Sequence, residues 1–182
     1  MLYGDEAIRD LLEDGLIRDG VDPRQINPAS LNLTLGNTFL VMKDCGGKPL
    51  TLGDEAQYGK AEIQDDGAFA IAPGQFVLAT TREFVQMPTH IAGFVQGRSS
   101  IGRIGLTTQN AGFIDPGFHG AITLELVNES NRVINLKPGY PIAQLILFRA
   151  SSVSRGYAGK YNGQIEATGS RMHQDAFNGR QK

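Results

Sequence analysis

The sequence predicts an all-β protein, a two-sheet sandwich or distorted jelly roll with one short helix at its N-terminus. Its 23 glycines and 8 prolines stand mostly between short runs in which apolar and polar residues alternate, which is typical of strands joined by turns. Hydrophobic residues make up 41% and charged residues 20% of the 182 residues, as in a folded domain rather than a disordered chain. That length fits one domain with one core.

Helical periodicity is found at the start of the chain, where four apolar residues share one face of a helix: Ile8, Leu11, Leu12 and Ile17. Asp5 is the expected N-cap, and Gly15 or Gly20 the expected end. The N-terminus carries acids where a secretory signal would have a basic and then an apolar region, and no apolar run approaches a membrane span. We therefore expect a cytoplasmic protein without membrane contact.

Alternation predicts the first long strand at residues 30–42 (SLNLTLGNTFLVM), in which Leu31, Leu33 and Leu35 share one face. Residues 71–85 and 136–150 each place a Pro-Gly turn before an apolar run, which predicts paired hairpins in a two-sheet fold. Residues 53–68 are polar and acidic, as in a long loop. Residues 151–182 have almost no apolar periodicity, so we expect a surface arm there.

Composition excludes several kinds of site. A formal charge of −2 provides no basic field to recruit nucleic acid. Cys45 is the single cysteine, which rules out an internal disulfide or a Cys-x-x-Cys pair. The three histidines, His90, His119 and His173, have no histidine partner at helical spacing. A zinc site is therefore not expected.

Residues 96–105 (QGRSSIGRIG) concentrate cationic and hydroxyl donors on a stretch that is too glycine-rich for a stable helix. Arg98, Ser99, Ser100 and Arg103 lie within six residues, and glycines let backbone N–H groups approach an anion. Two interpretations are open at this point: a solvated surface loop, or a cradle for an oligophosphate.

Two carboxylates follow the cradle. Asp115 precedes a Pro-Gly turn, a position that local turn chemistry alone explains. Glu125 lies in AITLELVN, where Ile122, Leu124 and Leu126 share one strand face and Thr123, Glu125 and Val127 share the other. A solvated strand face explains such a glutamate, whereas a carboxylate in a partly dry site would be a usable general base. Both carboxylates lie within about thirty residues of the cradle, which favours a catalytic site.

These segments resemble the dCTP deaminase family, homotrimeric β-proteins related to trimeric dUTPases. The likeness rests on RSSIGRIGL (98–106) and GFIDPGFHGAITLELVN (112–128), with INPASLNLTLGNTF (26–39) and IAPGQFVLATTREFVQMP (71–88) before them. GYAGKYNGQ (156–164), followed by Ser170 and Arg171, resembles the arm that folds over the nucleotide. The resemblance implies a dUTPase-like β domain over residues 1–150 and a closing C-terminal arm over residues 151–182.

The resemblance also implies roles for individual residues. Arg98, Ser99 and Ser100 match phosphate-binding positions, and Arg103 an arginine near the catalytic centre. Asp115 matches the aspartate that holds the deoxyribose 3′-hydroxyl, and Glu125 the general base that activates water for attack at C4 of cytosine. Contacts with the sugar and triphosphate are implied for three arm residues: Tyr157, Lys160 and Gln164. In this family the site lies between subunits of the homotrimer.

Residues 106–114 (LTTQNAGFI) depart from the deaminase pattern. Gln109, Asn110 and Ala111 stand where typical members carry a His-x-Thr-Ala-like segment, and the stretch, which also includes Phe113 as a substrate-binding candidate, is about one residue shorter. The AGFID pattern resembles bifunctional members that deaminate dCTP and cleave the product to dUMP and pyrophosphate, and the shorter hairpin is nearer to dUTPases. Three functions stay open: a zinc-free dCTP deaminase with or without that second activity, a dUTP pyrophosphatase, and a non-catalytic nucleotide-binding regulator.

The deamination chemistry predicts which cofactor and which nucleotides the protein would bind. Without the zinc-ligand pattern of other cytidine deaminases, a carboxylate has to move the proton of the attacking water. Mg²⁺ would enter bound to the triphosphate and not through a protein cage. The expected ligands are dCTP or dUTP, with dTTP as a candidate inhibitor.

Overall fold

The structure is a computed structural model that describes residues 1–61, 63–64, 66–109 and 112–175. Its elements in chain order are α1 (Asp5–Glu13), η1 (Pro23–Gln25), β1 (Ile26–Asn27), β2 (Ser30–Met42), β3 (Tyr58–Lys60), β4 (Phe69–Ile71), β5 (Phe76–Gln86), β6 (Ile91–Gly97), α2 (Ser99–Gly102), β7 (Leu106–Gln109), β8 (Phe113–Ile114), β9 (His119–Asn128), β10 (Ile134–Leu136), β11 (Pro141–Arg149) and η2 (Met172–Gln174).

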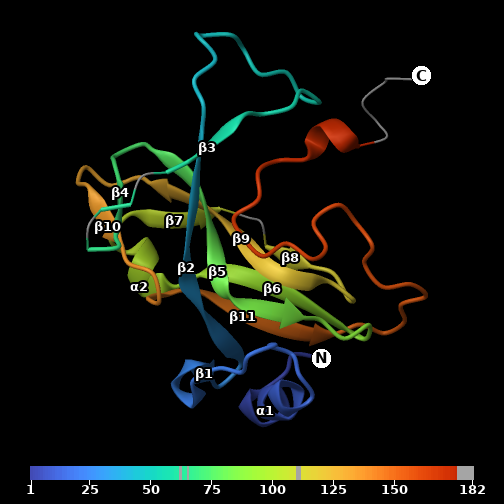
Figure 1. Cartoon of the computed structure of the whole chain (residues 1–182). Helices are drawn as coiled ribbons and strands as arrows, with labels where there is room; N and C mark the ends of the chain where they lie inside the picture. Colours follow the sequence, from blue (N-terminus) through green and yellow to red (C-terminus); the bar gives the residue numbers. More distant parts are fainter. Residues whose placement is uncertain (62, 65, 110–111, 176–182) are drawn as a thin grey trace, which may run out of the picture.

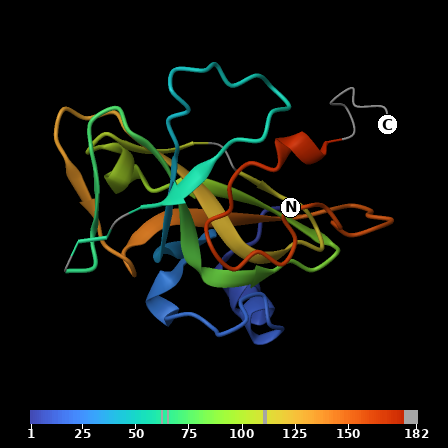
Figure 2. The same cartoon turned by 45° about the horizontal axis from the view of Figure 1, so that its top comes forward.

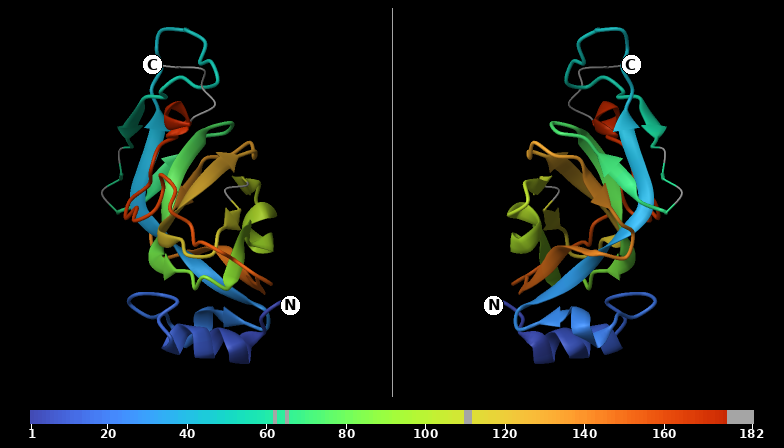
Figure 3. Two further views of the ribbon diagram at one scale, coloured as in Figure 1. Left: turned by 90° about the vertical axis from the view of Figure 1, so that its right-hand side faces the viewer. Right: turned by 90° about the vertical axis from the view of Figure 1, so that its left-hand side faces the viewer.

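One curled antiparallel sheet dominates the molecule, with its strands in the order β7-β9-β5-β2-β11-β6-β8 (Figures 1 and 3). β1 and β3 add to β2, and β4 pairs with β10 in a separate two-stranded sheet. The long strand β2 belongs to two layers, because its first half pairs with β11 and its second half with β5. The predicted all-β jelly roll with a short N-terminal helix is confirmed.

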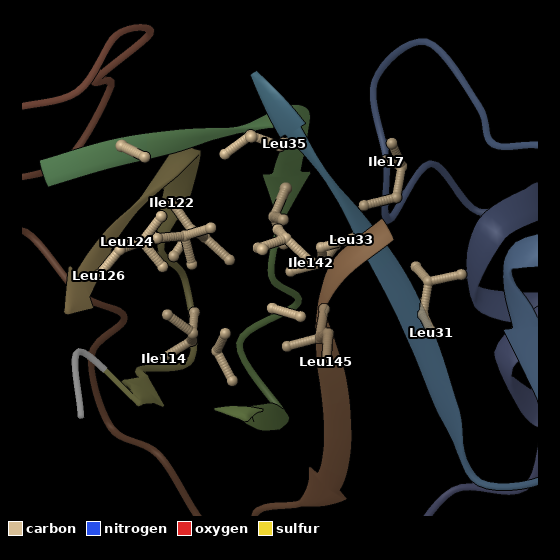
Figure 4. Packing of buried hydrophobic residues seen from close by; sticks show 14 of the residues in the cluster. Ile17, Leu31, Leu33, Leu35, Ile114, Ile122, Leu124, Leu126, Ile142 and Leu145 are labelled. Atoms are coloured by element: carbon tan, nitrogen blue, oxygen red, sulfur yellow. The ribbon is translucent and has the colours of Figure 1, made fainter. Parts of the chain in front are cut away.

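The space between the two layers is filled by aliphatic side chains (Figure 4). Leu31, Leu33 and Leu35 of β2 are fully buried there, as the alternation predicts. Leu124 and Leu126 of β9 are buried on the opposite side of the core, whereas Leu31 lies beside Ile17 of the N-terminal segment. Burying each such side chain contributes about 1.5–3 kcal/mol, and this burial fixes which face of β9 turns outward.

The predicted N-terminal helix is confirmed as α1, with Ile8 and Leu11 buried against the core. The expected cap is wrong: Gly4 is the N-cap, and Asp5 is the first helical residue and makes no capping hydrogen bond. Gly4 meets the backbone of Pro28, whose carbonyl accepts from the Asp5 N–H at 3.0 Å. A Cβ on Gly4 would lie 3.6 Å from Pro28 O, an ordinary contact, so packing does not require glycine at the cap.

The two Pro-Gly turns do not close hairpins, which corrects the expectation from residues 71–85 and 136–150. β4 and β10, which precede the turns, pair with each other, while β5 and β11, which follow them, lie on either side of β2. The Gly74 N–H donates to Asn128 O at 2.7 Å and the Gly139 N–H to Leu35 O at 2.7 Å. At each turn the chain passes from the two-stranded sheet to the large sheet. The turns bond to β9 and to β2, which are strands of the large sheet.

Two further expectations change in detail. The segment 53–68 is not all loop, since β3 lies within it and pairs with Leu40–Met42 of β2. The stretch 96–105 does form a helix, the four-residue α2, with Arg98 as its N-cap. Strand β6 ends at Gly97, and the chain turns there into α2.

A buried carboxylate fastens the corner at which β2 passes between the layers. Glu83, 7% exposed, lies in a bulge of β5 and accepts hydrogen bonds from Thr34 N (2.8 Å), Thr34 Oγ1 (2.7 Å) and Gln25 Nε2 (2.9 Å). Thr34 pairs with Pro141 at the end of the ladder between β2 and β11. At this end of the ladder the Glu83 carboxylate supplies the acceptor for the Thr34 N–H.

Gln25 is itself held by the N-terminal turn η1. Asp22 accepts from the Arg24 N–H, and Gln25 Oε1 accepts from the Asp22 N–H, which forms a capping box. Hydrogen bonds from the Arg24 side chain lower the pKa of Asp22 to about 2. The turn thus stays capped by an ionised carboxylate and presents Gln25 to Glu83.

We expect Glu83→Ala to lower the free energy of unfolding by about 2–4 kcal/mol, because it leaves the buried Thr34 N–H without an acceptor. Urea denaturation followed by circular dichroism measures the change. Arg82→Ala, at the exposed neighbouring position, is the control and should stay within about 0.5 kcal/mol of the parent protein. Equal stability of the two variants would contradict the role of Glu83 at the corner.

Candidate active site

β9 carries the candidate general base on its outward face. The core side chains Ile122, Leu124 and Leu126 are buried, and the alternate residues Thr123, Glu125 and Val127 are half-buried on the other face. The pairing places Leu78 of β5 and Gln109 of β7 directly opposite Glu125. No side chain that the structure describes makes a hydrogen bond or ion pair with the Glu125 carboxylate.

Glu125 lines a cavity of about 550 Å³ on this outward face. Apolar side chains form one wall: Met42, Tyr58, Phe76 and Leu78, from β2, β3 and β5. Thr123 and Glu125 supply the polar part of the β9 surface. The apolar wall lies on one side of the carboxylate, and Glu125 faces the cavity as the candidate base.

Asp115 lines the same cavity from the turn between β8 and β9. The turn is fixed by two hydrogen bonds, from Phe118 N to Asp115 O (3.1 Å) and from Gly117 N to Met87 O (3.1 Å). The Asp115 side chain is exposed. An exposed carboxylate at the cavity rim can accept hydrogen bonds from a hydroxyl ligand.

The C-terminal arm packs along this turn and along the start of β9 (Figure 2). Tyr157 N donates to Pro116 O (2.7 Å), Gly163 N to His119 O (2.7 Å), and Ala121 N to Gln164 O (2.8 Å). Further along, the Thr168 N–H donates to Thr123 Oγ1 (3.1 Å). Tyr157 and Gln164 consequently line the cavity together with Asp115 and Glu125.

Gly117, in the turn after Asp115, allows the backbone of the arm at Gly156 to approach closely. Gly117 has φ +85°, and a Cβ on it would lie 2.8 Å from Gly156 Cα and 2.9 Å from Tyr157 N. A side chain at residue 117 would therefore have to displace the arm's backbone as well as adopt a left-handed conformation.

We expect Gly117→Ala to release the arm while leaving the core folded. Trypsin cleavage at Arg155 and Lys160 should become about tenfold faster, because strain at this position favours the open arm, and mass spectrometry of timed digests measures it. Gly102→Ala is the matched control, since a Cβ on Gly102 meets nothing within 4 Å. Equal cleavage rates in the two variants would contradict the packing described for the arm.

The cradle residues Arg98, Ser99, Ser100 and Arg103 do not line this cavity. They belong to α2 and its ends, which lie on a different side of the sheet from the arm (Figures 1 and 3). Ser99, Ser100 and Arg103 are exposed, and Arg103 Nε donates to Ser99 Oγ at 3.3 Å. Arg98 is half-buried and donates to Pro141 O at 3.2 Å. One chain therefore presents the donors and the carboxylates on separate surfaces.

The other residues predicted to bind substrate are placed differently from one another. Phe113 lines the cavity, with its exposed ring 5.2 Å from that of Phe94. Gln109 pairs with Glu125 through its backbone, and Asn110 and Ala111 fall outside the described residues. Lys160 does not line the cavity; its ammonium forms an ion pair with Asp175.

Sequence reasoning missed part of the cavity. Thr123 could have been found, since it shares the face of Glu125 in a strand of period two. Phe76 and Leu78 could not, because the sequence does not say that β5 pairs with β9. Tyr58 and Tyr161, from the acidic segment and the arm, also line the cavity.

Within residues 1–61, 63–64, 66–109 and 112–175, no group of three or more His, Cys, Asp or Glu side chains could hold a metal ion. In the same ranges, no helix has the length and apolar character needed to cross a membrane.

The chain belongs to the dCTP deaminase-like family, whose sequence profile matches residues 2–150. It is 42% identical over 178 residues to a dUMP-forming dCTP deaminase of Persephonella marina, covering 96% of this chain and 99% of that protein. A dUMP-forming dCTP deaminase of Aquifex aeolicus is 40% identical over 177 residues, covering 96% and 97%. The crystal structure of a 2′-deoxycytidine 5′-triphosphate deaminase from Agrobacterium tumefaciens superposes with a TM-score of 0.61 at 20% identity, over 80% of this chain and 47% of that one, which supports the fold.

Proposed function

We propose that the protein hydrolyses dCTP to dUTP and ammonia and then cleaves dUTP to dUMP and pyrophosphate. The observation that carries the proposal is Glu125, a half-buried carboxylate that lines a nucleotide-sized cavity together with Asp115. The names of the relatives that match almost the whole chain support the same activity.

In the first step Glu125 removes a proton from water as the oxygen attacks C4 of cytosine. The tetrahedral adduct then receives that proton on its amino group, the C4–N bond breaks and ammonia leaves. The proton of the C4 hydroxyl passes to N3 as the C4 carbonyl of uracil forms. Donors around the base would stabilise the charge that develops on the ring. Leu78 keeps water from one side of Glu125, so the captured proton is retained for the leaving group.

Asp115 would accept a hydrogen bond from the deoxyribose 3′-hydroxyl at the cavity rim, and Phe113 would border the base. In the second step water attacks the α-phosphorus of dUTP and pyrophosphate leaves, with Asp115 orienting that water. Tyr157 and Gln164 would close the arm over the sugar, while Lys160 would reach the triphosphate after exchanging its Asp175 partner for phosphate.

Mg²⁺ fits this site as a companion of the triphosphate. When bound, Mg²⁺ would be held mainly by the triphosphate oxygens and waters. In that position it would supply positive charge that neutralises the phosphates for pyrophosphate release.

We further propose that the complete site forms between copies of the chain in a homotrimer. The cradle of Arg98, Ser99, Ser100 and Arg103 would come from one copy and the carboxylates from the next. An interface that joins two different surfaces is heterologous and closes into a ring when the rotation fits. This arrangement accounts for donors and carboxylates on separate surfaces of one chain.

dTTP, which shares the sugar and the triphosphate with the substrate, is a candidate inhibitor. The intracellular substrate would place the enzyme in the cytoplasm.

We expect the protein, given dCTP and Mg²⁺, to release ammonia and pyrophosphate when the two products are followed separately. Glu125→Gln should slow ammonia release by about 10²–10⁴-fold, because the amide cannot accept the proton, while dCTP binding changes little. Glu129→Gln, at an exposed position just beyond β9, is the control. Full deamination by Glu125→Gln would refute the general base. Pyrophosphate from dUTP without ammonia from dCTP would indicate a dUTP pyrophosphatase, and neither product a nucleotide-binding regulator.

The shared site has its own test by complementation. Arg103→Ala and Glu125→Gln should each be inactive alone, but chains co-expressed in equal amounts should recover about a quarter of parental activity, since that share of interfaces joins two intact halves. Ammonia release from the purified mixture measures it. Mixed trimers as inactive as either variant would contradict a site built from two copies.

A further inference from the structure

Asn162 of the arm does not line the cavity, but its side-chain amide contacts the segments that carry the candidate nucleotide-binding residues. Asn162 Oδ1 accepts a hydrogen bond from the His119 N–H at 2.9 Å, and Asn162 Nδ2 donates to Tyr157 O at 3.2 Å. His119 is the first residue of β9, the strand that bears Glu125. A single half-buried side chain thus ties the arm both to that strand and to the residue that presents the Tyr157 ring.

These bonds close the bend in which Lys160 and Tyr161 lie. The bond from Asn162 to Tyr157 O joins the two ends of residues 157–162, and the Asn162 N–H donates to Gly159 O at 3.1 Å inside the bend. Beyond it, Gly163 has φ +80° and donates to His119 O at 2.7 Å. Asn162 therefore helps to fix the position of Lys160 relative to β9, together with the Arg171 guanidinium, which donates to Lys160 O.

The other arm contacts along β9 do not replace this bridge. Most are backbone pairs, and the Gln164 side chain, which donates to Ala121 O at 2.8 Å, is itself a predicted ligand. Among the described side chains of the arm, Asn162 is the one that bonds to both His119 and Tyr157. Its loss would leave the ends of the bend held by the backbone bonds from Tyr157 N to Pro116 O and from Gly163 N to His119 O, with no side chain joining them.

We propose that Asn162 is a positioning residue for nucleotide binding: it holds Tyr157, Lys160 and Gln164 in the arrangement that meets the nucleotide beside Asp115. The inference rests on the proposed function and goes beyond it in assigning the order of the arm to a residue that does not touch substrate. An arm ordered before binding loses less conformational entropy when the ligand arrives, so the effect should fall on affinity and not on the chemical step.

We expect Asn162→Ala to raise the KM and the Kd for dCTP by about 5- to 20-fold, the loss of two hydrogen bonds, with kcat within about threefold. The melting temperature should move by only about 2 °C, because the bridge lies outside the core. Isothermal titration gives Kd, and ammonia release gives kcat and KM. Asn37→Ala, at an exposed asparagine of β2 that does not line the cavity, should leave every value unchanged.

A double variant separates positioning from a general loss of structure. If Asn162 acts by placing Lys160, Asn162→Ala should weaken binding less in a Lys160→Ala background than in the parent. An unchanged Kd in Asn162→Ala, a fall in kcat at constant Kd, or equal effects in both backgrounds would overturn the proposal. If the parent protein binds dCTP but releases no ammonia, the deaminase assignment fails, while the Kd comparison still decides the role of Asn162.

Discussion

The fold depends on the bond between the Glu83 carboxylate and the backbone of Thr34. A strand that serves two layers must leave one ladder and enter another, and β2 does so between Thr34, which pairs with β11, and Leu35, which pairs with β5. Glu83, within the bulge of β5, accepts the hydrogen bond of the Thr34 N–H at that point. The bond joins the layer of β5 and β9, which carries Glu125, to the strand that also pairs with β11.

The corner also explains why the proposed catalytic groups diverge. The carboxylates lie on the outward face of one layer, and the serines and arginines follow the end of the other. Closing the two layers onto one nucleotide would require the core between them to be removed. In the proposed trimer a neighbouring copy would bring the second surface to the first, so oligomerisation and catalysis would share one interface.

Sequence patterns predicted what depends on near neighbours. Alternation identified the core face of β2 and the outward face that holds Glu125, and the Pro-Gly pairs marked real turns. The pairing of β4 with β10 and the packing of the arm on His119 could not be predicted, because both join residues far apart in the chain. The apolar wall of Phe76 and Leu78 was missed for the same reason. The helix α2 was missed because its glycine content predicts against a helix, and sequence propensity does not include the tertiary contacts that override it.

The strand order has a consequence for solubility. The two terminal strands of the sheet, β7 and β8, are separated in the chain by residues 110–112 alone, a span that reaches at most about 14 Å. The ends of the sheet must therefore come close to each other, and both terminal strands are short. Long free strand edges are the templates on which foreign backbones add and aggregates grow. Because its terminal strands are short, the sheet of a single chain offers little of that template.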